Sequence, residues 1–363
     1  MKKNLQAQFA EITVYQDQTE HEVISSGRAL HALTGECIGD EMYLFASDCN
    51  SIVSVNRITG TVKTQYGDER QPYSREYLYT DSLVYEGMIY FVSNKLPYVL
   101  KFDPVSGLKK YIAHNGLLIN YLPCRYGKRL FLLPVEYSDR IICVDLSHDA
   151  VSYIPCIYPS DLMQAAQRVN EVLLFGLGIQ VGRYVYQGSR VNSSLRQFDL
   201  ETGKEKYLTV EGFQRPIRQM AFDGTHLWLL SLDGLLAQWD YRKNKIIFSL
   251  NLSKEIGQQN VLYVACFCQK DAVYILENRG SCILKFNIQE KVLSQYDCSA
   301  IPGFQLKRPE GLAFSEGIRV NDKGAICFFP YLANGIFCWN TEDKVQFYLT
   351  VSAKALGRAV TQQ

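Results

Sequence analysis

The apolar residues of this chain fall in short runs that recur at a nearly constant spacing. Seven runs of four apolar residues begin at these positions: Met42, Ile89, Leu130, Val172, Leu227, Val273 and Ile326. Each is followed by a second apolar run that closes on an acidic or amide residue: Asn56, Asp103, Asp145, Asp199, Asp240, Asn287 and Asn340. The intervals between the two are 14, 14, 15, 27, 13, 14 and 14 residues. Runs this short and this apolar are typical of strands buried on both faces.

Turn signals around these runs complete a repeating unit. Gly, Asp and Asn precede the first runs, as in "YEG" (85–87) and "DGT" (223–225), and "RITG" (57–60) and "PVSG" (104–107) follow the second runs. An Asp or Asn at a strand end can accept hydrogen bonds from the following turn, and Gly can adopt the positive φ that such turns need. Seven such four-stranded units predict an all-β fold, a seven-bladed β-propeller of four-stranded antiparallel blades.

Aromatic residues dominate one position of the repeat. The second residues of the first runs are Tyr43, Tyr90, Phe131, Leu173, Trp228, Tyr274 and Cys327. Because this position recurs once per unit inside a buried strand, we interpret the column as packing between neighbouring blades and not as a cofactor-stacking site.

The closures of the repeats resemble a known group of propellers. "KFDPVSG" (101–107) and "QFDLETG" (197–203) are similar to the repeats of quinoprotein-like and YVTN-like propellers, and the resemblance spans about residues 30–351. It implies the architecture and no particular activity. Quinoprotein repeats carry a Trp that locks adjacent blades, whereas this chain has Tyr or Phe there, as in "KKYI" (109–112), so no quinone cofactor is expected.

The connections predict two unequal faces. In an up-and-down blade, the loops between second and third strands and the loops between blades emerge together, opposite the remaining turns. The long connections share the first of these faces, which we call the long-loop face: residues 65–82, 113–121, 155–166, 209–218, 251–262 and 297–317. The 27-residue interval in blade four adds an insertion over residues 176–193 to the same face.

Arg and Tyr side chains on the long-loop face are the candidate residues for binding a ligand or partner, because these types anchor interfaces and stack on planar ligands. The insertion contributes Arg183, Tyr184, Tyr186 and Arg190; the connection 65–82 contributes Arg70, Tyr73 and Arg75; the similar loops "GFQRP" (212–216) and "GFQLKRP" (303–309), with their flanks, contribute Arg215, Arg218, Lys307, Arg308 and Glu310. Phe213 and Phe304 of these two loops are expected to plug clefts between blades.

Composition narrows the class of protein. Lys and Arg number 38 against 37 Asp and Glu, so no overall charge directs the chain to nucleic acid or to an anionic membrane. No apolar stretch reaches the length of a membrane span or a signal peptide, which predicts a cytoplasmic protein. The 11 cysteines lie mostly within apolar runs and are expected to be reduced and buried, and the five histidines form no metal-binding motif. We therefore expect no metal and no cofactor.

Two functions remain open at this stage. The first is a non-catalytic binding or scaffold propeller that recognises a protein, a peptide or an anionic sugar-like ligand. The second is an enzyme of the lactonase, hydrolase or lyase type at the end of the central axis, with Glu310, His114 or Arg218 in acid-base roles. We predict one monomeric domain: an N-terminal segment (1–30) that adds an edge strand to blade seven, seven repeats (31–351) and a C-terminal tail (352–363).

Overall fold

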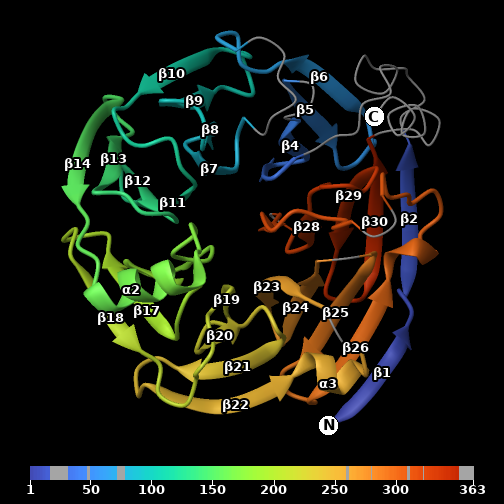
Figure 1. Ribbon diagram of the computed structural model, residues 1–363. Helices are drawn as coiled ribbons and strands as arrows, with labels where there is room; N and C mark the ends of the chain where they lie inside the picture. The colour runs from blue at the N-terminus through green and yellow to red at the C-terminus, as the bar shows by residue number, and fades with distance from the viewer. Residues whose placement is uncertain are drawn as a thin grey trace.

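The computed structural model describes residues 1–16, 32–46, 50–71, 78–258, 261–278, 280–308, 311–321 and 323–350. Seven sheets form a ring, and the chain passes through them in sequence order (Figure 1). Within each sheet the first strand lies nearest the central axis and the fourth lies at the rim. The predicted seven-bladed, four-stranded architecture is confirmed.

The first four blades are each one four-stranded antiparallel sheet. Blade one holds β3 (Gly35–Ile38), β4 (Glu41–Ala46), β5 (Ser51–Asn56) and β6 (Val62–Tyr66). Blade two holds β7 (Asp81–Tyr85), β8 (Met88–Val92), β9 (Tyr98–Phe102) and β10 (Lys109–Ala113). Blade three holds β11 (Tyr121–Tyr126), β12 (Arg129–Pro134), β13 (Arg140–Asp145) and β14 (Ala150–Pro155). Blade four holds β15 (Ile179–Val181), β16 (Tyr184–Gly188), β17 (Ser194–Asp199) and β18 (Glu205–Thr209).

The remaining three blades complete the ring. Blade five holds β19 (Gln219–Phe222), β20 (Leu227–Leu230), β21 (Leu235–Asp240) and β22 (Lys245–Asn251). Blade six holds β23 (Tyr263–Gln269), β24 (Ala272–Glu277), β25 (Cys282–Asn287) and β26 (Val292–Asp297). Blade seven holds β27 (Arg319–Val320), β28 (Ile326–Phe328), β29 (Gly335–Trp339) and β30 (Lys344–Leu349). Short helical segments lie in the connections: α2 (Ser160–Val169), α3 (Leu252–Ile256) and η2 (Cys298–Ala300).

The N-terminal segment adds a fifth strand to two blades. β2 (Glu11–Gln16) pairs in parallel with β30 of blade seven, and β1 (Lys2–Ala7) pairs in parallel with β26 of blade six. Between them, the Phe9 ring lies 5.1 Å from Tyr296 and 5.4 Å from Trp339, measured between ring centroids. One short segment therefore pairs with the outer edges of two adjacent blades.

The Asp and Asn residues of the repeat close the third strands as the sequence predicts. Each of the seven accepts a hydrogen bond from the backbone of the following turn, as in Asn56 Oδ1 with Thr59 N at 2.9 Å and Asp103 Oδ1 with Val105 N at 2.9 Å. The residue that ends each of these turns has a positive φ: Gly60, Gly107, Asp149, Gly203, Asn244, Lys291 and Asp343. The repeat signature therefore encodes the turn geometry.

Blade four differs from the prediction. The run at Val172 is not its second strand, because Val172 is 68% exposed and lies outside the strands. The second strand is β16, and the interval from Val185 to Asp199 is the usual 14 residues. Tyr186, paired with Gln197, takes the place in the aromatic column that Leu173 was expected to hold. The extra residues therefore precede the blade, in the connection from β14 to β15 that includes α2.

Candidate functional site

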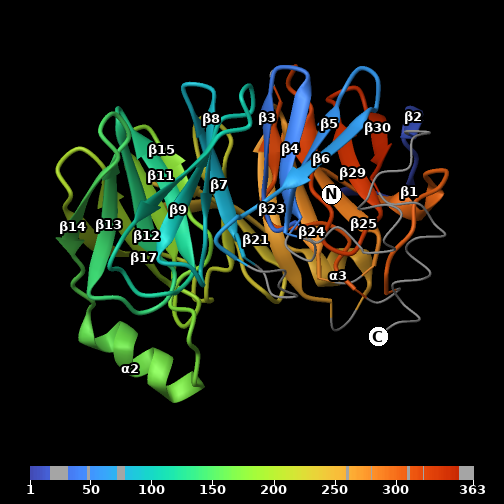
Figure 2. The same ribbon diagram turned by 90° about the horizontal axis from the view of Figure 1, so that it is seen from above.

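The connection into blade four runs along the central axis. After α2, residues 171–178 form an extended segment that we call the strap. Phe175 N donates to Val135 O of blade three at 3.0 Å, Gly176 N donates to Gly188 O of blade four at 2.9 Å, and Leu177 bridges to Gln219 of blade five. The strap is thus fixed to three successive blades, while α2 projects from the long-loop face (Figure 2).

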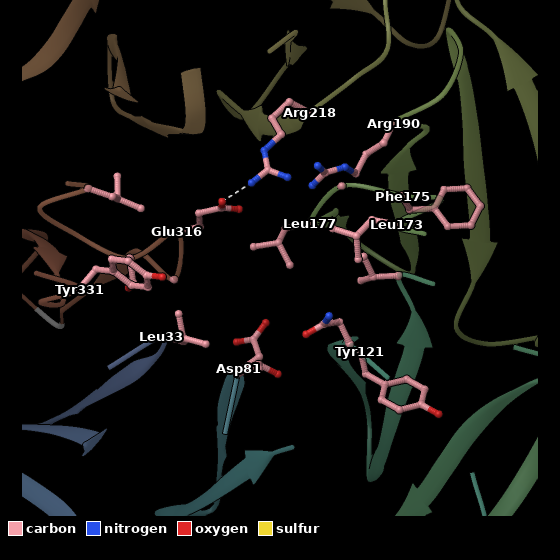
Figure 3. A pocket seen from close by; sticks show the side chains of 17 residues that line it. Leu33, Asp81, Tyr121, Leu173, Phe175, Leu177, Arg190, Arg218, Glu316 and Tyr331 are labelled. Atoms are coloured by element: carbon pink, nitrogen blue, oxygen red, sulfur yellow. Dashed lines mark hydrogen bonds and ion pairs between the residues drawn. The ribbon is translucent and has the colours of Figure 1, made fainter. Parts of the chain in front are cut away.

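The strap forms one wall of a pocket of about 280 Å³, which we call the axial pocket (Figure 3). The other walls come from residues at or just before the innermost strands of several blades, and from residues that follow the second strands of blades three, four and seven. The lining residues are Leu33, Thr80, Asp81, Asn120, Tyr121, Val135, Leu173, Phe175, Gly176, Leu177, Arg190, Arg218, Leu312, Ser315, Glu316, Gly317 and Tyr331. A volume near the lower end of the roughly 300–1,000 Å³ typical of ligand pockets suits a small molecule or the end of a chain.

Two guanidinium groups converge at one side of the axial pocket. Arg218 forms an ion pair with Glu316, and Arg190 lies 3.8 Å from Glu171 of the strap. Both arginine side chains are mostly buried, at 15% exposure for Arg218 and 18% for Arg190. Burial raises the pKa of the Glu316 carboxyl, although the nearby Arg218 opposes this shift. The pair is therefore held in a partly dehydrated setting where charge interactions are strong.

A buried ion network lies at the opposite side of the axial pocket. Arg319 at the start of β27 donates to Glu36 Oε1 at 3.1 Å, to Asp81 Oδ1 at 2.8 Å and to Ser82 O at 2.9 Å. These partners belong to the innermost strands of blades one and two. We call this network the Arg319 clasp, since it ties blade seven to the first two blades. Burial raises the pKa of the Asp81 carboxyl, which Arg319 only partly offsets.

Three of the described residues that line the axial pocket each carry a buried polar atom without a partner. Within the described residues, Thr80 Oγ1, Arg218 Nε and Ser315 Oγ are buried and make no hydrogen bond. Leaving a buried donor or acceptor unsatisfied costs roughly 1–3 kcal/mol, so such groups are rare unless a ligand or ordered water completes them. Three such groups therefore belong to residues around one small cavity.

The structure places Arg190 and Arg218 together in the axial pocket and distributes the other expected residues elsewhere. Arg70 stacks over the Tyr111 ring at 4.1 Å near the rim of blade two, and exposed Arg215 lies 3.6 Å from Asp233. Lys307 is half-buried and Arg308 is exposed, and neither is among the lining residues of the described chain. Tyr73, Arg75 and Glu310 lie outside the described residues.

The expected positions of three insertion residues are wrong. Arg183 and Tyr184 lie at the turn between β15 and β16, on the face opposite the long loops, where Arg183 contacts Asp199 at 3.3 Å and pairs with Glu201. Tyr186 is a core residue of β16, 3% exposed, and its hydroxyl accepts a hydrogen bond from Gln197 at 2.6 Å. The physical reason is that the second strand lies later in the sequence than predicted. Residues 179–188, which were predicted to form a surface loop, form the β15–β16 hairpin.

Asp81, Ser315 and Glu316 are among the polar pocket residues that the sequence did not single out. They lie where the chain enters the innermost strands of blades two and seven, in "TDS" (80–82) and "SEG" (315–317). Hydrophilic residues at these strand entries were an available signal, because the innermost strands of a propeller converge on its axis.

The two described acid-base candidates, His114 and Arg218, are not brought together in the axial pocket. His114 is 6% exposed, and burial lowers its pKa to about 4, so its ring is neutral near pH 7. Its Nδ1 accepts a hydrogen bond from Gly116 N at 3.2 Å, and it is not among the residues lining the axial pocket. Arg218 is paired with Glu316, and Glu310 lies outside the described residues.

Metal-ligand clusters and membrane-spanning helices are both absent from the described residues. Across these ranges, no three or more His, Cys, Asp or Glu side chains gather as metal ligands would. None of the helices in the described part of the chain has the length and apolar character needed to cross a bilayer.

Comparison with known proteins identifies the fold only. No family model and no curated protein matches the chain. Among solved structures, a streptogramin B lyase is similar at 12% identity with a TM-score of 0.61, covering 85% of this chain and 92% of that one. Virginiamycin B lyase from Staphylococcus aureus is similar at 9% identity with a TM-score of 0.61, covering 84% of this chain and 93% of that one. BamB from Moraxella catarrhalis is similar at 10% identity with a TM-score of 0.52, covering 87% and 83%.

Proposed function

We propose that this protein is a non-catalytic binding propeller whose axial pocket recognises a carboxylate-bearing small molecule or peptide end. The observation that carries the proposal is the set of unsatisfied polar atoms, Thr80 Oγ1, Arg218 Nε and Ser315 Oγ, at one cavity of the described structure. A bound polar group would complete these atoms and remove their cost.

The acidic group is inferred from the two arginines. The Arg190 and Arg218 guanidiniums lie at the same side of the pocket (Figure 3), and planar guanidinium groups hold a carboxylate through paired, charge-assisted hydrogen bonds. The lining leucines, Leu33, Leu173, Leu177 and Leu312, would contact a hydrocarbon body. This combination of an apolar wall with a few placed polar groups is typical of small-molecule sites.

A binding screen with a matched pair of variants tests the proposal. Thermal-shift screening followed by calorimetry would use short peptides with a free carboxyl end, N-acetyl amino acids and uronic acids. Replacing Arg190 by Gln should weaken binding of any hit by roughly 10- to 150-fold, because a hydrogen bond to a charged group contributes about 1.5–3 kcal/mol. Arg190 is chosen because Arg218→Gln would leave the Glu316 carboxylate without its partner.

Arg183→Gln provides the control, since Arg183 lies on the opposite face. Equal affinity of the Arg190→Gln variant and the wild-type protein for every hit would contradict carboxylate recognition in the axial pocket. A screen in which none of these acids shifts the melting temperature would reject the proposal for this class of ligand.

A lyase or hydrolase activity at the axial pocket is the second candidate. It is favoured by the raised pKa of the buried Glu316 carboxyl, which makes this group a better proton acceptor than an ordinary glutamate. Mass spectrometry of each screening hit after prolonged incubation would detect turnover. Chemical change that is lost in Glu316→Gln while binding persists would favour the enzyme over the binding protein.

The cellular setting also stays a prediction. All ten cysteines in the described residues are free thiols, which fits the reducing cytoplasm expected from the sequence. We expect a monomer that binds neither nucleic acid nor membranes, to be checked by light scattering and by fractionation of cells that express the tagged chain.

A further inference from the structure

The two lining arginines and Asp81 lie on different sides of the axial pocket, and Glu316 is paired with Arg218 on the arginine side. Figure 3 shows Arg190 and Arg218 at one side and Asp81 at the other, with Leu177 between them. The carboxyl of Asp81 is only partly used by the protein: Oδ1 accepts from Arg319 at 2.8 Å and from Ser82 N at 2.8 Å. Within the described chain, no hydrogen bond reaches Asp81 Oδ2, although Asp81 lines the pocket. This oxygen is available to a donor from a ligand.

Asn120 adds a second acceptor: it lines the pocket just before β11, the strand that contacts β7, where Asp81 lies. Its side-chain amide donates to Glu136 Oε1 at 2.7 Å, which fixes the orientation of the group. Its Oδ1 accepts one hydrogen bond, from Asn94 at 3.2 Å, and a carbonyl oxygen can accept two. A cationic donor on this side of the pocket would therefore meet a carboxylate and an oriented amide oxygen.

The charged side chains that line the pocket balance one another. Among the described lining residues these are Asp81, Arg190, Arg218 and Glu316, two of each sign. A ligand that is only anionic would place its charge near Arg190 and Arg218 while leaving Asp81 without a counter-charge from the ligand. A ligand with a charge of each sign matches both sides, and discrimination between ligands arises from such complementarity and its failures.

We infer that the ligand is a zwitterion whose ammonium and carboxylate groups are separated by an apolar body, as in a free dipeptide. The inference rests on the proposed function: the carboxylate occupies the Arg190 and Arg218 side, and the ammonium donates to Asp81 Oδ2 and Asn120 Oδ1. The hydrocarbon body lies against Leu173 and Leu177 of the strap. Two side chains thus bind the carboxylate and two bind the ammonium group. The strap excludes water from the space between these two groups.

Four related probes test the inference on the wild-type protein by calorimetry: leucyl-leucine, N-acetyl-leucyl-leucine, leucyl-leucine amide and 6-aminohexanoate. The first carries both charges, the second lacks the ammonium, the third lacks the carboxylate, and the fourth has both charges but no peptide bond. We expect leucyl-leucine to bind, and each singly capped form to bind at least tenfold more weakly. Binding of 6-aminohexanoate would show that the two charges suffice without the peptide group and would support the inference.

A substitution in the protein tests whether Asp81 binds the ammonium group. Asp81→Asn should reduce the preference for leucyl-leucine over its N-acetyl form to less than threefold, while Asp139→Asn, an exposed aspartate paired with Arg140, should leave it unchanged. If Asp81→Asn does not fold, the four-probe series on the wild-type protein decides alone.

The two proposals fail in different ways. If N-acetyl-leucyl-leucine binds as tightly as leucyl-leucine while the amide does not bind, the ammonium site is overturned and carboxylate recognition stands. If none of the four probes binds but an acid without an ammonium group does, the zwitterion inference is likewise wrong. If neither these probes nor the acids of the wider screen bind, both proposals fall.

Discussion

Removing the guanidinium of Arg319 should destabilise the ring more than removing that of Arg140, Arg183 or Arg190. The Arg319 clasp holds two carboxylates at low exposure, 9% for the Glu36 side chain and 12% for the Asp81 side chain. Arg319→Met keeps an apolar side chain of similar length but leaves both carboxylates without their cation. The substitution therefore tests the cost of uncompensated charge and not the loss of packing.

The expected magnitude follows from the burial of the clasp. Breaking a buried ion pair from one side costs roughly 3–5 kcal/mol. Because the Arg319 side chain is itself 26% exposed, water can reach part of the network, and we take about 3 kcal/mol, the lower end of that range. An unfolding entropy of about 2.1 cal/mol/K per residue gives roughly 0.76 kcal/mol/K for 363 residues, so the melting temperature should fall by about 4 °C.

The pH dependence has a definite sign. Without Arg319, the folded-state pKa of Asp81, already raised by burial, rises further above its unfolded value. Such a group binds more protons when folded, so its destabilising effect is fully present at high pH and is lost as pH falls through the folded pKa. The difference in melting temperature between variant and wild type should therefore be larger at pH 8 than at pH 5.5.

Calorimetric melting at both pH values measures these effects. Arg140→Met is the control, since Arg140 is 40% exposed and pairs with an exposed aspartate, and it should change stability by less than about 0.5 kcal/mol. Combining Arg319→Met with Glu36→Gln and Asp81→Asn should recover most of the loss. A melting temperature for Arg319→Met within 1 °C of wild type, on the order of the assay error, or a deficit that does not shrink at low pH, would refute the reasoning.

Three further predictions concern packing, the pocket and the cysteines. Phe9→Ala should lower the free energy of unfolding by roughly 2 kcal/mol, because it removes a half-buried ring packed on Tyr296 and Trp339; denaturant melts measure this. Gly176→Ala should weaken leucyl-leucine binding at least tenfold in calorimetry, because its Cβ would clash with the Arg218 backbone oxygen and displace the strap. Thiol titration in denaturant should find all 11 cysteines free, and the native protein should react slowly, since burial raises the pKa of thiols such as Cys266.

The fold was largely predictable because its signals are local. A buried strand, a tight turn and the Asp or Asn that closes it all fall within about fifteen residues, so seven copies reinforce one another. The one misplaced strand shows the limit of this logic. "VLLF" at Val172 is as apolar as a true second strand. Only the helical spacing of Leu162 and Ala166, the two buried residues of α2, distinguishes a helix and strap from another blade strand.

The axial pocket was predictable only in part because it depends on the closure of the ring. The long connections directed attention to Arg190 and Arg218, and both residues line the axial pocket, since long loops gather on one face. Asp81 and Glu316 are 235 residues apart in the sequence. Both line the axial pocket because the first strands of blades two and seven lie beside the central axis. No single local pattern predicts which distant residues meet at the axis. The number of blades, taken together with the polar residues at the strand entries, does predict it.

Asp81 belongs both to the Arg319 clasp and to the axial pocket, and this couples stability to binding. Its Oδ1 serves the clasp, while Oδ2 faces the site we assign to an ammonium group. A cation placed beside a carboxylate lowers the pKa of that carboxylate, so an ammonium at Oδ2 would oppose the upward shift that burial imposes on Asp81. Binding of a zwitterion near the pKa of Asp81 should then release protons, whereas binding of an N-acetyl acid, which contacts only the arginine side, should not. In the Arg319 clasp, one arginine pairs with two carboxylates, Glu36 and Asp81. The ammonium would add a second positive charge beside these carboxylates, and so stabilise the junction between blades seven, one and two.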